Sequence, residues 1–228
     1  MFQELILISM FGGLVALDKT EAFQSMFSQP LVAGPIVGLL LNDLPGGLFV
    51  GVLFQLVYLW VMPIGAPTFP DPAVGTVVGS AGFIILRGSF PDNPNLILLF
   101  VLVFVIPFSL FAGWALIKQR QLNSKFLTKA DLYAEGGKIE GFGRLLLLGL
   151  SGSFVRGFLI TASGVLAIFV LLAPLVKASS FAPQALFQRI EIPAWGVGMG
   201  TMIYLFGRKK NSLWMAGGAL LGILLLLL

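Results

Sequence analysis

The side chains that could do chemistry in this sequence are few, and each lies among apolar residues. Gln55 and Arg156 each lie in a long apolar run, and Asp71 is held between two prolines. Polar groups at membrane depth are costly and are therefore functional candidates. A neutral amide donates and accepts hydrogen bonds, and a fixed carboxylate accepts them from paired hydroxyls. Gln55 and Asp71 therefore indicate a site for a hydroxyl-rich ligand such as a sugar.

Each of these side chains also has a structural interpretation. Gln55 either contacts a sugar hydroxyl or forms an interhelical hydrogen bond. Asp71 binds a ligand, caps the helix expected from Ala73 onward, or does both. Arg156 snorkels toward a headgroup, contacts a ligand, or pairs with a carboxylate inside the bundle, and pairing is the interpretation that we favour.

Two further carboxylates are explained by local structure. Asp43 lies in the turn signal from Asn42 to Gly47, and we expect it to cap or close that turn. Asp18 and Glu21 have the spacing of an N-cap and its capping-box partner, which predicts a short amphipathic helix through Phe27. We assign both Asp43 and Asp18 to structural roles.

The composition indicates an integral membrane protein. Of 228 residues, 57% are hydrophobic and only 11% are charged, and the mean hydropathy is +0.98, well outside the range of a soluble domain. Histidine and cysteine are both absent. A disulfide framework, a thiolate metal site, a Ser/His/Asp triad and a phosphohistidine relay on this chain are therefore excluded, and we expect no cofactor and no metal.

The positive charge follows membrane topology. Nine of the fourteen basic residues lie in two short stretches, the pattern of cytoplasmic loops. They are Lys118, Arg120, Lys125, Lys129, Lys138 and Arg144 in one stretch, and Arg208, Lys209 and Lys210 in the other. No aromatic residues are interleaved as they would be in a nucleic-acid surface, so we expect no nucleic-acid partner.

The apolar stretch from Leu31 to Ala81 is broken into pieces too short to cross a bilayer. A crossing needs about 20 residues, and neither Leu31–Leu41 nor Leu48–Val61 has that length. These two pieces are expected to form a re-entrant hairpin. Met62–Pro72 contains four prolines and is expected to form an ordered loop. Short, Gly- and Pro-interrupted segments of this kind commonly mark the binding site of a transporter.

The rest of the chain is predicted to be helical as well. Phe2–Leu17 is read as a retained first helix, because it lacks the basic start of a secretory signal. Leu96–Ile117 is the first uninterrupted span, and a polar connection follows it. Leu145–Val176 is expected to break near Gly152, and a short helix is expected over Pro193–Phe206. The fold class is an all-α membrane bundle with re-entrant half-helices, in one domain over 1–228: a broken-helix part at about 12–86 and a helical part at about 96–228.

Glycines recur at four-residue spacing along this bundle. The pairs are Gly34/Gly38, Gly47/Gly51, Gly75/Gly79, Gly196/Gly200 and Gly218/Gly222. Small residues at this spacing let membrane helices approach closely. Most of these faces are expected to pack within the chain, and some to meet a second subunit.

The N-terminal third resembles a known family. The residues that carry the likeness are Gln29 to Pro35, Leu39 to Asp43, Gly51 to Met62, Ile64 to Ala66 and Pro70-Asp71. They are similar to the IIC subunit of mannose/fructose/sorbose-type bacterial phosphotransferase systems. The likeness is strong over about 12–85 and continues more faintly through Ile106-Pro107 and Phe154-Val155-Arg156.

The resemblance implies a sugar-translocating subunit in the bacterial inner membrane. It also implies a IID membrane partner, an oligomer, and separate IIA and IIB proteins that carry the phosphohistidines, so that this chain is not itself an enzyme. The family's sugar contacts correspond here to Gln55, to Pro63 with Gly65 and Ala66, and to Asp71.

Two positions depart from the family pattern. A glutamate is typical where this chain has Gln55, and some members have an asparagine where it has Pro63. These changes leave three interpretations open: transport of another sugar by a phosphotransferase subunit, a facilitator that works without phosphorylation, and a structural subunit whose site has decayed.

Overall fold

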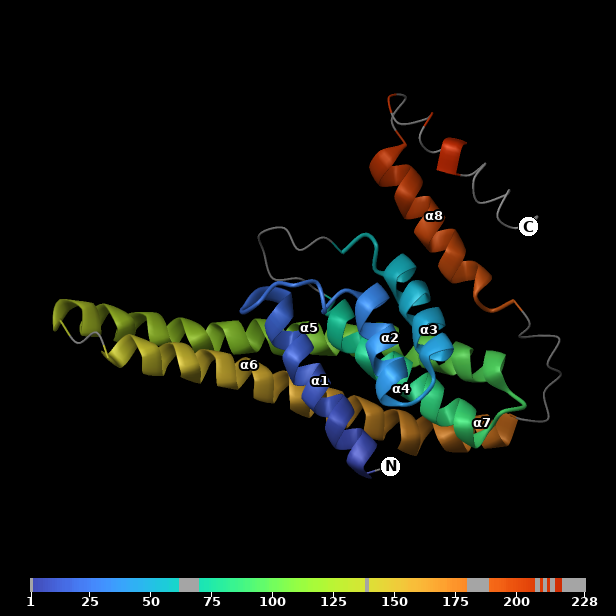
Figure 1. Ribbon diagram of the computed structural model, residues 1–228, viewed down its shortest axis with the longest axis horizontal. Helices are drawn as coiled ribbons and strands as arrows, with labels where there is room; N and C mark the ends of the chain where they lie inside the picture. Colours follow the sequence, from blue (N-terminus) through green and yellow to red (C-terminus); the bar gives the residue numbers. More distant parts are fainter. Residues whose placement is uncertain are drawn as a thin grey trace.

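The computed structural model describes residues 2–61, 70–137, 140–179 and 189–207, with a few residues beyond them. Every regular element within these ranges is a helix. Three helical stretches are long and apolar enough to cross a membrane: Pro72–Ser89, Pro94–Glu135 and Gly141–Ser179. The expected all-α membrane bundle is confirmed, and Figure 1 shows its long helices beside a group of short ones.

Helix α1 spans Phe2–Thr20, and the amphipathic helix expected from Asp18 to Phe27 is wrong. The chain leaves the helix here, with positive φ angles at Phe23, Gln24 and Met26. Asp18 is the cause, because its carboxylate accepts hydrogen bonds from Ser25 N–H, Ser25 O–H and Ser28 N–H. A side chain that binds nearby backbone in this way stabilises a loop instead of a helix.

Helices α2 (Pro30–Leu40) and α3 (Leu44–Val57) form an antiparallel hairpin. They have 11 and 14 residues, or roughly 16 and 21 Å at the α-helical rise. Both are shorter than the bilayer core of about 30 Å. Asn42 turns the chain between them with a φ of 58°, a conformation that asparagine tolerates better than most residues.

The four glycines of this hairpin bring the two backbones into direct contact. A Cβ on Gly34 would lie 2.6 Å from both the Gly47 carbonyl oxygen and the Gly51 Cα. A Cβ on Gly38 would lie 2.7 Å from the Asp43 carbonyl oxygen. Since no larger side chain fits at Gly34 or Gly38, the spaced glycines here serve packing within the chain.

Helix α4 (Pro72–Ser89) is the centre of the molecule. Of its residues 78% are buried. In the apolar parts of α5 and of the stretch Gly141–Ser179, only 44% and 39% of the residues are buried. It contacts α1, α2, α3, α5 and α6. The start of α4 at Asp71 therefore lies inside protein, where irregular backbone at membrane depth is tolerated.

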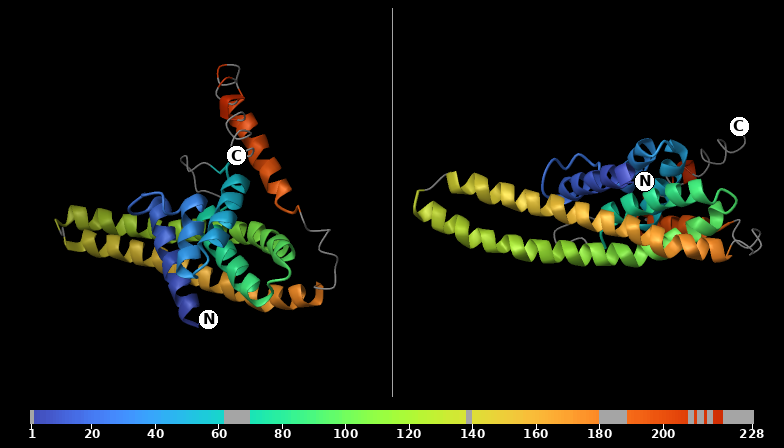
Figure 2. Two further views of the ribbon diagram at one scale, coloured as in Figure 1. Left: turned by 45° about the vertical axis from the view of Figure 1, so that its right-hand side comes forward. Right: turned by 90° about the horizontal axis from the view of Figure 1, so that it is seen from below.

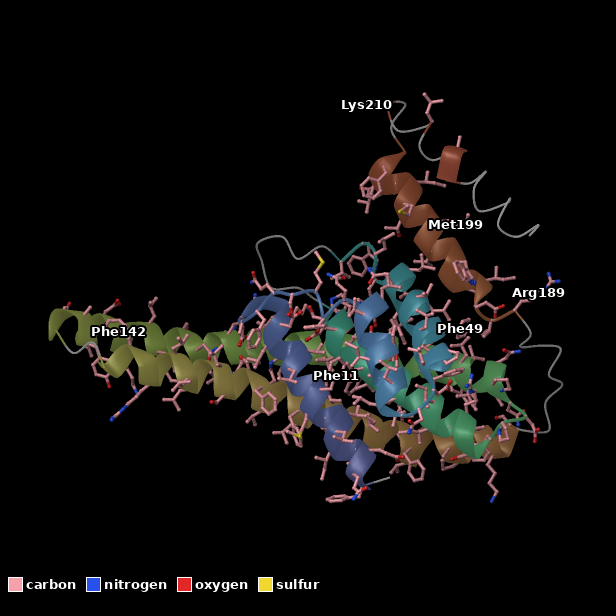
Figure 3. The ribbon with its side chains drawn as sticks, viewed as in Figure 1. Phe11, Phe49, Phe142, Arg189, Met199 and Lys210 are labelled. Atoms are coloured by element: carbon pink, nitrogen blue, oxygen red, sulfur yellow. The ribbon has the colours of Figure 1, made fainter. Side chains whose placement is uncertain are left out.

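Helices α5 (Pro94–Glu135) and α6 (Glu140–Ala167) lie side by side and extend well past the short helices (Figures 1 and 2). Most of the expected polar connection is thus helical. Phe142 lies near the end of the long helices that is farthest from the short ones (Figure 3). The break expected near Gly152 is wrong, since α6 continues through it. Gly152 instead makes room for α5: a Cβ there would lie 2.6 Å from Gln119 Nε2.

The helix irregularity lies further on, in the π-helical turn η1 (Ile168–Leu172), which leads into α7 (Ala173–Ser179). Helix α8 (Ile192–Phe206) packs on α3, where Gly198 lies against the Leu56 side chain. Figure 1 shows α8 rising away from the long helices, and in Figure 3 Arg189 lies just before its start and Met199 lies within it. The apolar residues 213–228 that follow lie almost wholly outside the described residues.

Candidate functional site

Asp71 is the N-cap of α4 and is completely buried. Its Oδ1 atom accepts from Val74 N–H at 3.5 Å, and its own backbone N–H donates to the Ser109 carbonyl of α5 at 2.8 Å. The flanking prolines fit this geometry, because Pro72 at the first helical position needs no hydrogen-bond acceptor. The carboxylate is therefore held at the junction between the short helices and the long ones.

Two cations from distant parts of the chain face this carboxylate. Lys19 Nζ, at the end of α1, lies 2.9 Å from Asp71 Oδ1 and donates a hydrogen bond to it. Arg156 Nη1, on α6, lies 3.7 Å from Asp71 Oδ2. The side chains of Lys19 and Arg156 are only 9% and 7% exposed. The cluster thus holds two positive charges and one negative charge away from solvent.

Small residues between α1 and α6 bring the two cations together. Gly12 lies directly against the Thr161 side chain. Gly157 lies against Ala16, and a Cβ on Gly157 would be only 2.7 Å from the Gly12 carbonyl oxygen. This contact lets the two helices cross closely. The crossing places the last turn of α1 and the middle of α6 on the same side of Asp71.

Several buried polar atoms near this cluster have no hydrogen-bond partner among the described residues. They are Asp71 Oδ2, Arg156 Nε and Nη1, Ser153 Oγ and Tyr58 Oη. Tyr58 approaches from the end of α3, where its hydroxyl and the Ser109 Cβ both lie against Gly75. Buried polar groups are normally paired, so this set of donors and acceptors is suited to a polar ligand.

The structure gives Gln55 a partner in α2. Its Oε1 accepts from Leu31 N–H at 3.2 Å, and Leu31 is in the first turn of a helix whose own N-cap residue, Gln29, makes no side-chain cap. Gln55 is half-buried. Its oxygen thus supplies the missing cap from across the hairpin, which is the interhelical alternative stated for this residue.

Asp43 is the N-cap of α3 and accepts from Gly46 N–H at 3.1 Å. Its other oxygen accepts from Arg87 Nη2 at 2.5 Å. Arg87 lies in the last turn of α4, so this pair ties the α2–α3 turn to the opposite end of α4 from Asp71. Pro63, Gly65 and Ala66, the remaining predicted sugar contacts, lie outside the described residues.

The sequence reasoning missed Lys19, Ser153 and Tyr58 as members of the cluster. Lys19 is 52 positions from Asp71. Its neighbour Asp18 has the sequence pattern of a helix N-cap, which hides the role of Lys19 at the end of α1. A useful signal was available, because a lysine in the last turn of an apolar helix needs either solvent or a carboxylate. Ser153 is one turn from Arg156 on α6, a spacing that puts both on one helix face.

The fold and this buried ion cluster define a class: multi-pass helical membrane proteins with half-length helices around a charged central site. Two solved structures share the fold at 17% sequence identity. One, described as a membrane protein, has a TM-score of 0.74 over 98% of this chain and 87% of its own. The other, the mannose transporter ManYZ in complex with microcin E492, has a TM-score of 0.64 over 100% and 96%.

The family is shown by sequence. The family model described as the sorbose-specific IIC component of the phosphotransferase system matches residues 2–224, and the chain belongs to this family. The fructose permease IIC component of Bacillus subtilis is 30% identical over 60% of this chain and 46% of the relative. The mannose-specific EIIC component of Escherichia coli K12 is 26% identical over 50% and 40%. The matches thus span about half the length of these relatives.

Proposed function

We propose that this chain is the sugar-translocating IIC-type subunit of a phosphoenolpyruvate-dependent phosphotransferase system in the bacterial inner membrane. The observation that carries the proposal is the buried Asp71, fixed at the start of α4 and carrying one oxygen without a hydrogen-bond partner among the described residues. A carboxylate oxygen in this position accepts from sugar hydroxyls. Membership of the IIC family supports the same function.

The sugar site is proposed to include Asp71 and the segment before it, with Pro63, Gly65 and Ala66. Gln55 belongs to this proposal only through its amide nitrogen, because its oxygen accepts from Leu31. The relatives are named for fructose and mannose. We propose a monosaccharide of this size as the substrate.

The proposed motion is a shift of the broken-helix unit, α2 to α4, against α1, α5 and α6. In the conformation seen here Asp71 has no exposed surface, and its contacts reach all three of these helices. A sugar bound at Asp71 is therefore enclosed. Movement of α4 away from Lys19 and Arg156 would expose the sugar to the cytoplasm, as alternating access requires.

The phosphoryl group is proposed to come from partners, because the chain has no histidine. We propose a IID-type subunit as the membrane partner, an oligomeric assembly, and soluble IIA and IIB proteins as phosphocarriers. Labelled sugar would then appear inside vesicles as sugar phosphate. Release of unmodified sugar without IIA and IIB would instead identify a facilitator.

The test is uptake of labelled mannose, fructose or sorbose into proteoliposomes that hold the chain and its membrane partner, with the phosphocarriers inside. Asp71→Ala would leave two buried cations without a carboxylate, which is strongly destabilising. The double variant D71N/K19Q is less disruptive, because it removes one charge of each sign, keeps the net charge of the cluster and leaves one buried cation without a carboxylate instead of two. It should reach the membrane in normal amount and transport none of the three sugars. Unchanged uptake would refute the site.

A further inference from the structure

Arg156 has more hydrogen-bonding capacity than its surroundings use. The residue is 8% exposed, yet its Nε and Nη1 atoms have no hydrogen-bond partner among the described residues. Its nearest charged neighbour is Asp71 Oδ2, at 3.7 Å from Nη1, which is beyond a hydrogen bond. A guanidinium carries five N–H donors in a fixed plane. Two nitrogens that carry three N–H groups are therefore without a hydrogen-bond partner among the described residues, and one of them, Nη1, lies beside Asp71.

Balancing the charge of Asp71 does not explain Arg156. Lys19 already provides a direct ion pair and hydrogen bond at 2.9 Å. One lysine neutralises one carboxylate, so the buried arginine is a second cation facing a single anion. Burying an extra charge is costly, and a structural need of Asp71 does not require it. An interaction outside the cluster is the remaining use for the open N–H groups.

The separation of Arg156 Nη1 and Asp71 Oδ2 lets one oxygen atom contact both. An oxygen can lie about 2.8 Å from both Nη1 and Oδ2 when those atoms are 3.7 Å apart. Such an atom accepts from the arginine and donates to the carboxylate, which a hydroxyl does and a carbonyl does not. The pair is therefore selective for a hydroxyl group.

A second hydroxyl contact lies one helical turn away. Ser153 has no exposed surface, and its Oγ has no partner among the described residues. Residues three apart on a helix share a face, so Ser153 and Arg156 lie together on α6. A serine hydroxyl both donates and accepts. Ser153 therefore offers a second polar contact on the helix face that carries Arg156.

We propose that Arg156 is a direct ligand of the translocated sugar, sharing one ring hydroxyl with Asp71 Oδ2 while Ser153 contacts a neighbouring hydroxyl. This inference rests on the proposed function and extends the sugar site from the broken-helix unit to α6. Arg156 then connects the sugar to the helix against which α4 moves. Sugar binding would stabilise the enclosed conformation.

The experiment measures sugar binding by calorimetry on the chain copurified with its membrane partner. The probes are mannose, fructose and sorbose, and then the monodeoxy analogues of whichever sugar binds best. Wild type should bind one analogue about tenfold or more weakly, the loss expected for a hydrogen bond to a charged group. R156K should bind the parent sugar about as weakly as wild type binds that analogue, and its affinity should fall no further when the analogue replaces the parent sugar. S153A should likewise bind the parent sugar more weakly than wild type does, and it should show no further loss of affinity with the analogue that lacks the neighbouring hydroxyl.

The control is R87K, which alters the matched arginine–aspartate pair at the other end of α4 and should bind every sugar as wild type does. If R156K and S153A bind the parent sugar and all analogues as wild type does, the inference is wrong. The inference is also wrong if R156K and S153A lose the same factor of affinity for the parent sugar and for every analogue, because such a loss shows a structural role. S153A provides the test alone if R156K does not accumulate.

D71N/K19Q separates this inference from the proposed function. If it loses sugar binding while R156K and S153A keep wild-type behaviour, the site at Asp71 stands and only the role of Arg156 and Ser153 is refuted. If it binds as wild type does, or if wild type binds none of the sugars, both proposals are refuted.

Discussion

Lys19 Nζ lies 2.9 Å from Asp71 Oδ1 and so joins the end of α1 to the start of α4. The contact joins helices whose main packing partners differ: α1 packs mostly on α6, whereas α4 packs mostly on α5, α2 and α3 and less on α6 and α1. A buried ion pair of this kind is weak evidence for stability. In the proposed transport cycle this contact defines the enclosed conformation of the site, and the proposed motion of the broken-helix unit would break it.

The two sides of this ion pair should respond unequally to mutation. Lys19→Met leaves Asp71 facing Arg156, with no net charge, and should destabilise the protein only slightly. Asp71→Ala leaves two buried cations and should cost about 3–5 kcal/mol, the usual effect of removing one partner of a buried pair. Thermal unfolding in detergent measures both. Equal losses of stability would contradict the charge count given for the cluster.

The glycine contact between α2 and α3 should tolerate no side chain. Gly34→Val places branched carbons against the Gly47 and Gly51 backbone, where even a Cβ is only 2.6 Å away. Backbone atoms cannot give way, so the hairpin must separate. We expect a large loss of folded protein on size-exclusion chromatography.

Gly88→Ala is the matched control for the glycine prediction, because nothing lies within 4 Å of a Cβ at that position of α4. Alanine is also favoured over glycine in a helix by about 1 kcal/mol. Normal or slightly higher yield is expected. Folding of Gly34→Val at wild-type yield would show that the two helices do not need this close approach.

Asp43 should contribute to stability and not to transport. Asp43→Ala removes the cap of α3 and the partner of Arg87, and loss of an N-cap costs about 0.5–2 kcal/mol. Asp43→Asn keeps an oxygen for the cap and should lose less. Unfolding temperature should therefore fall in the order wild type, D43N, D43A, with sugar uptake per folded molecule unchanged. Loss of uptake in D43N would place Asp43 in the transport machinery.

A disulfide between α4 and α6 should stop transport. A Cβ on Gly164 would lie 2.8 Å from Val78 Cγ2. Because Cγ2 is one C–C bond of about 1.5 Å from the Val78 Cβ, the two Cβ atoms would be at most about 4.3 Å apart, which a disulfide with a Cβ separation of about 3.5–4.5 Å can bridge. The chain has no other cysteine. Oxidised V78C/G164C should lose sugar uptake and regain it with dithiothreitol, while either single variant is insensitive. Full uptake by the cross-linked protein would exclude movement of α4 against α6.

Local sequence signals predicted the helix breaks well. The turn from Asn42 to Gly47 and the prolines around Asp71 act over a few residues, so their caps followed directly from the residue types. Gly152 shows the limit of such signals. A glycine in a membrane helix serves either as a break or as a place for a neighbour, and only the position of Gln119 on α5 distinguishes the two.

The composition of the charged cluster could not be predicted from the sequence. Lys19, Asp71 and Arg156 are separated by 52 and 85 positions, and no local pattern connects them. What brings Lys19 and Arg156 together is the close crossing of α1 and α6 at Gly12 and Gly157. The spaced glycines within α2 and α3 were visible in sequence, whereas this pairing of glycines on distant helices appears only in the fold.

The central claim is that sugar is bound and moved at Asp71. The most direct test is uptake of labelled mannose, fructose and sorbose into proteoliposomes with the membrane partner and phosphocarriers, comparing wild type with D71N/K19Q at equal amounts of inserted protein. The account predicts accumulation of at least one sugar as its phosphate by wild type and none by the variant. Equal accumulation by both proteins, or no transport by wild type, would contradict it.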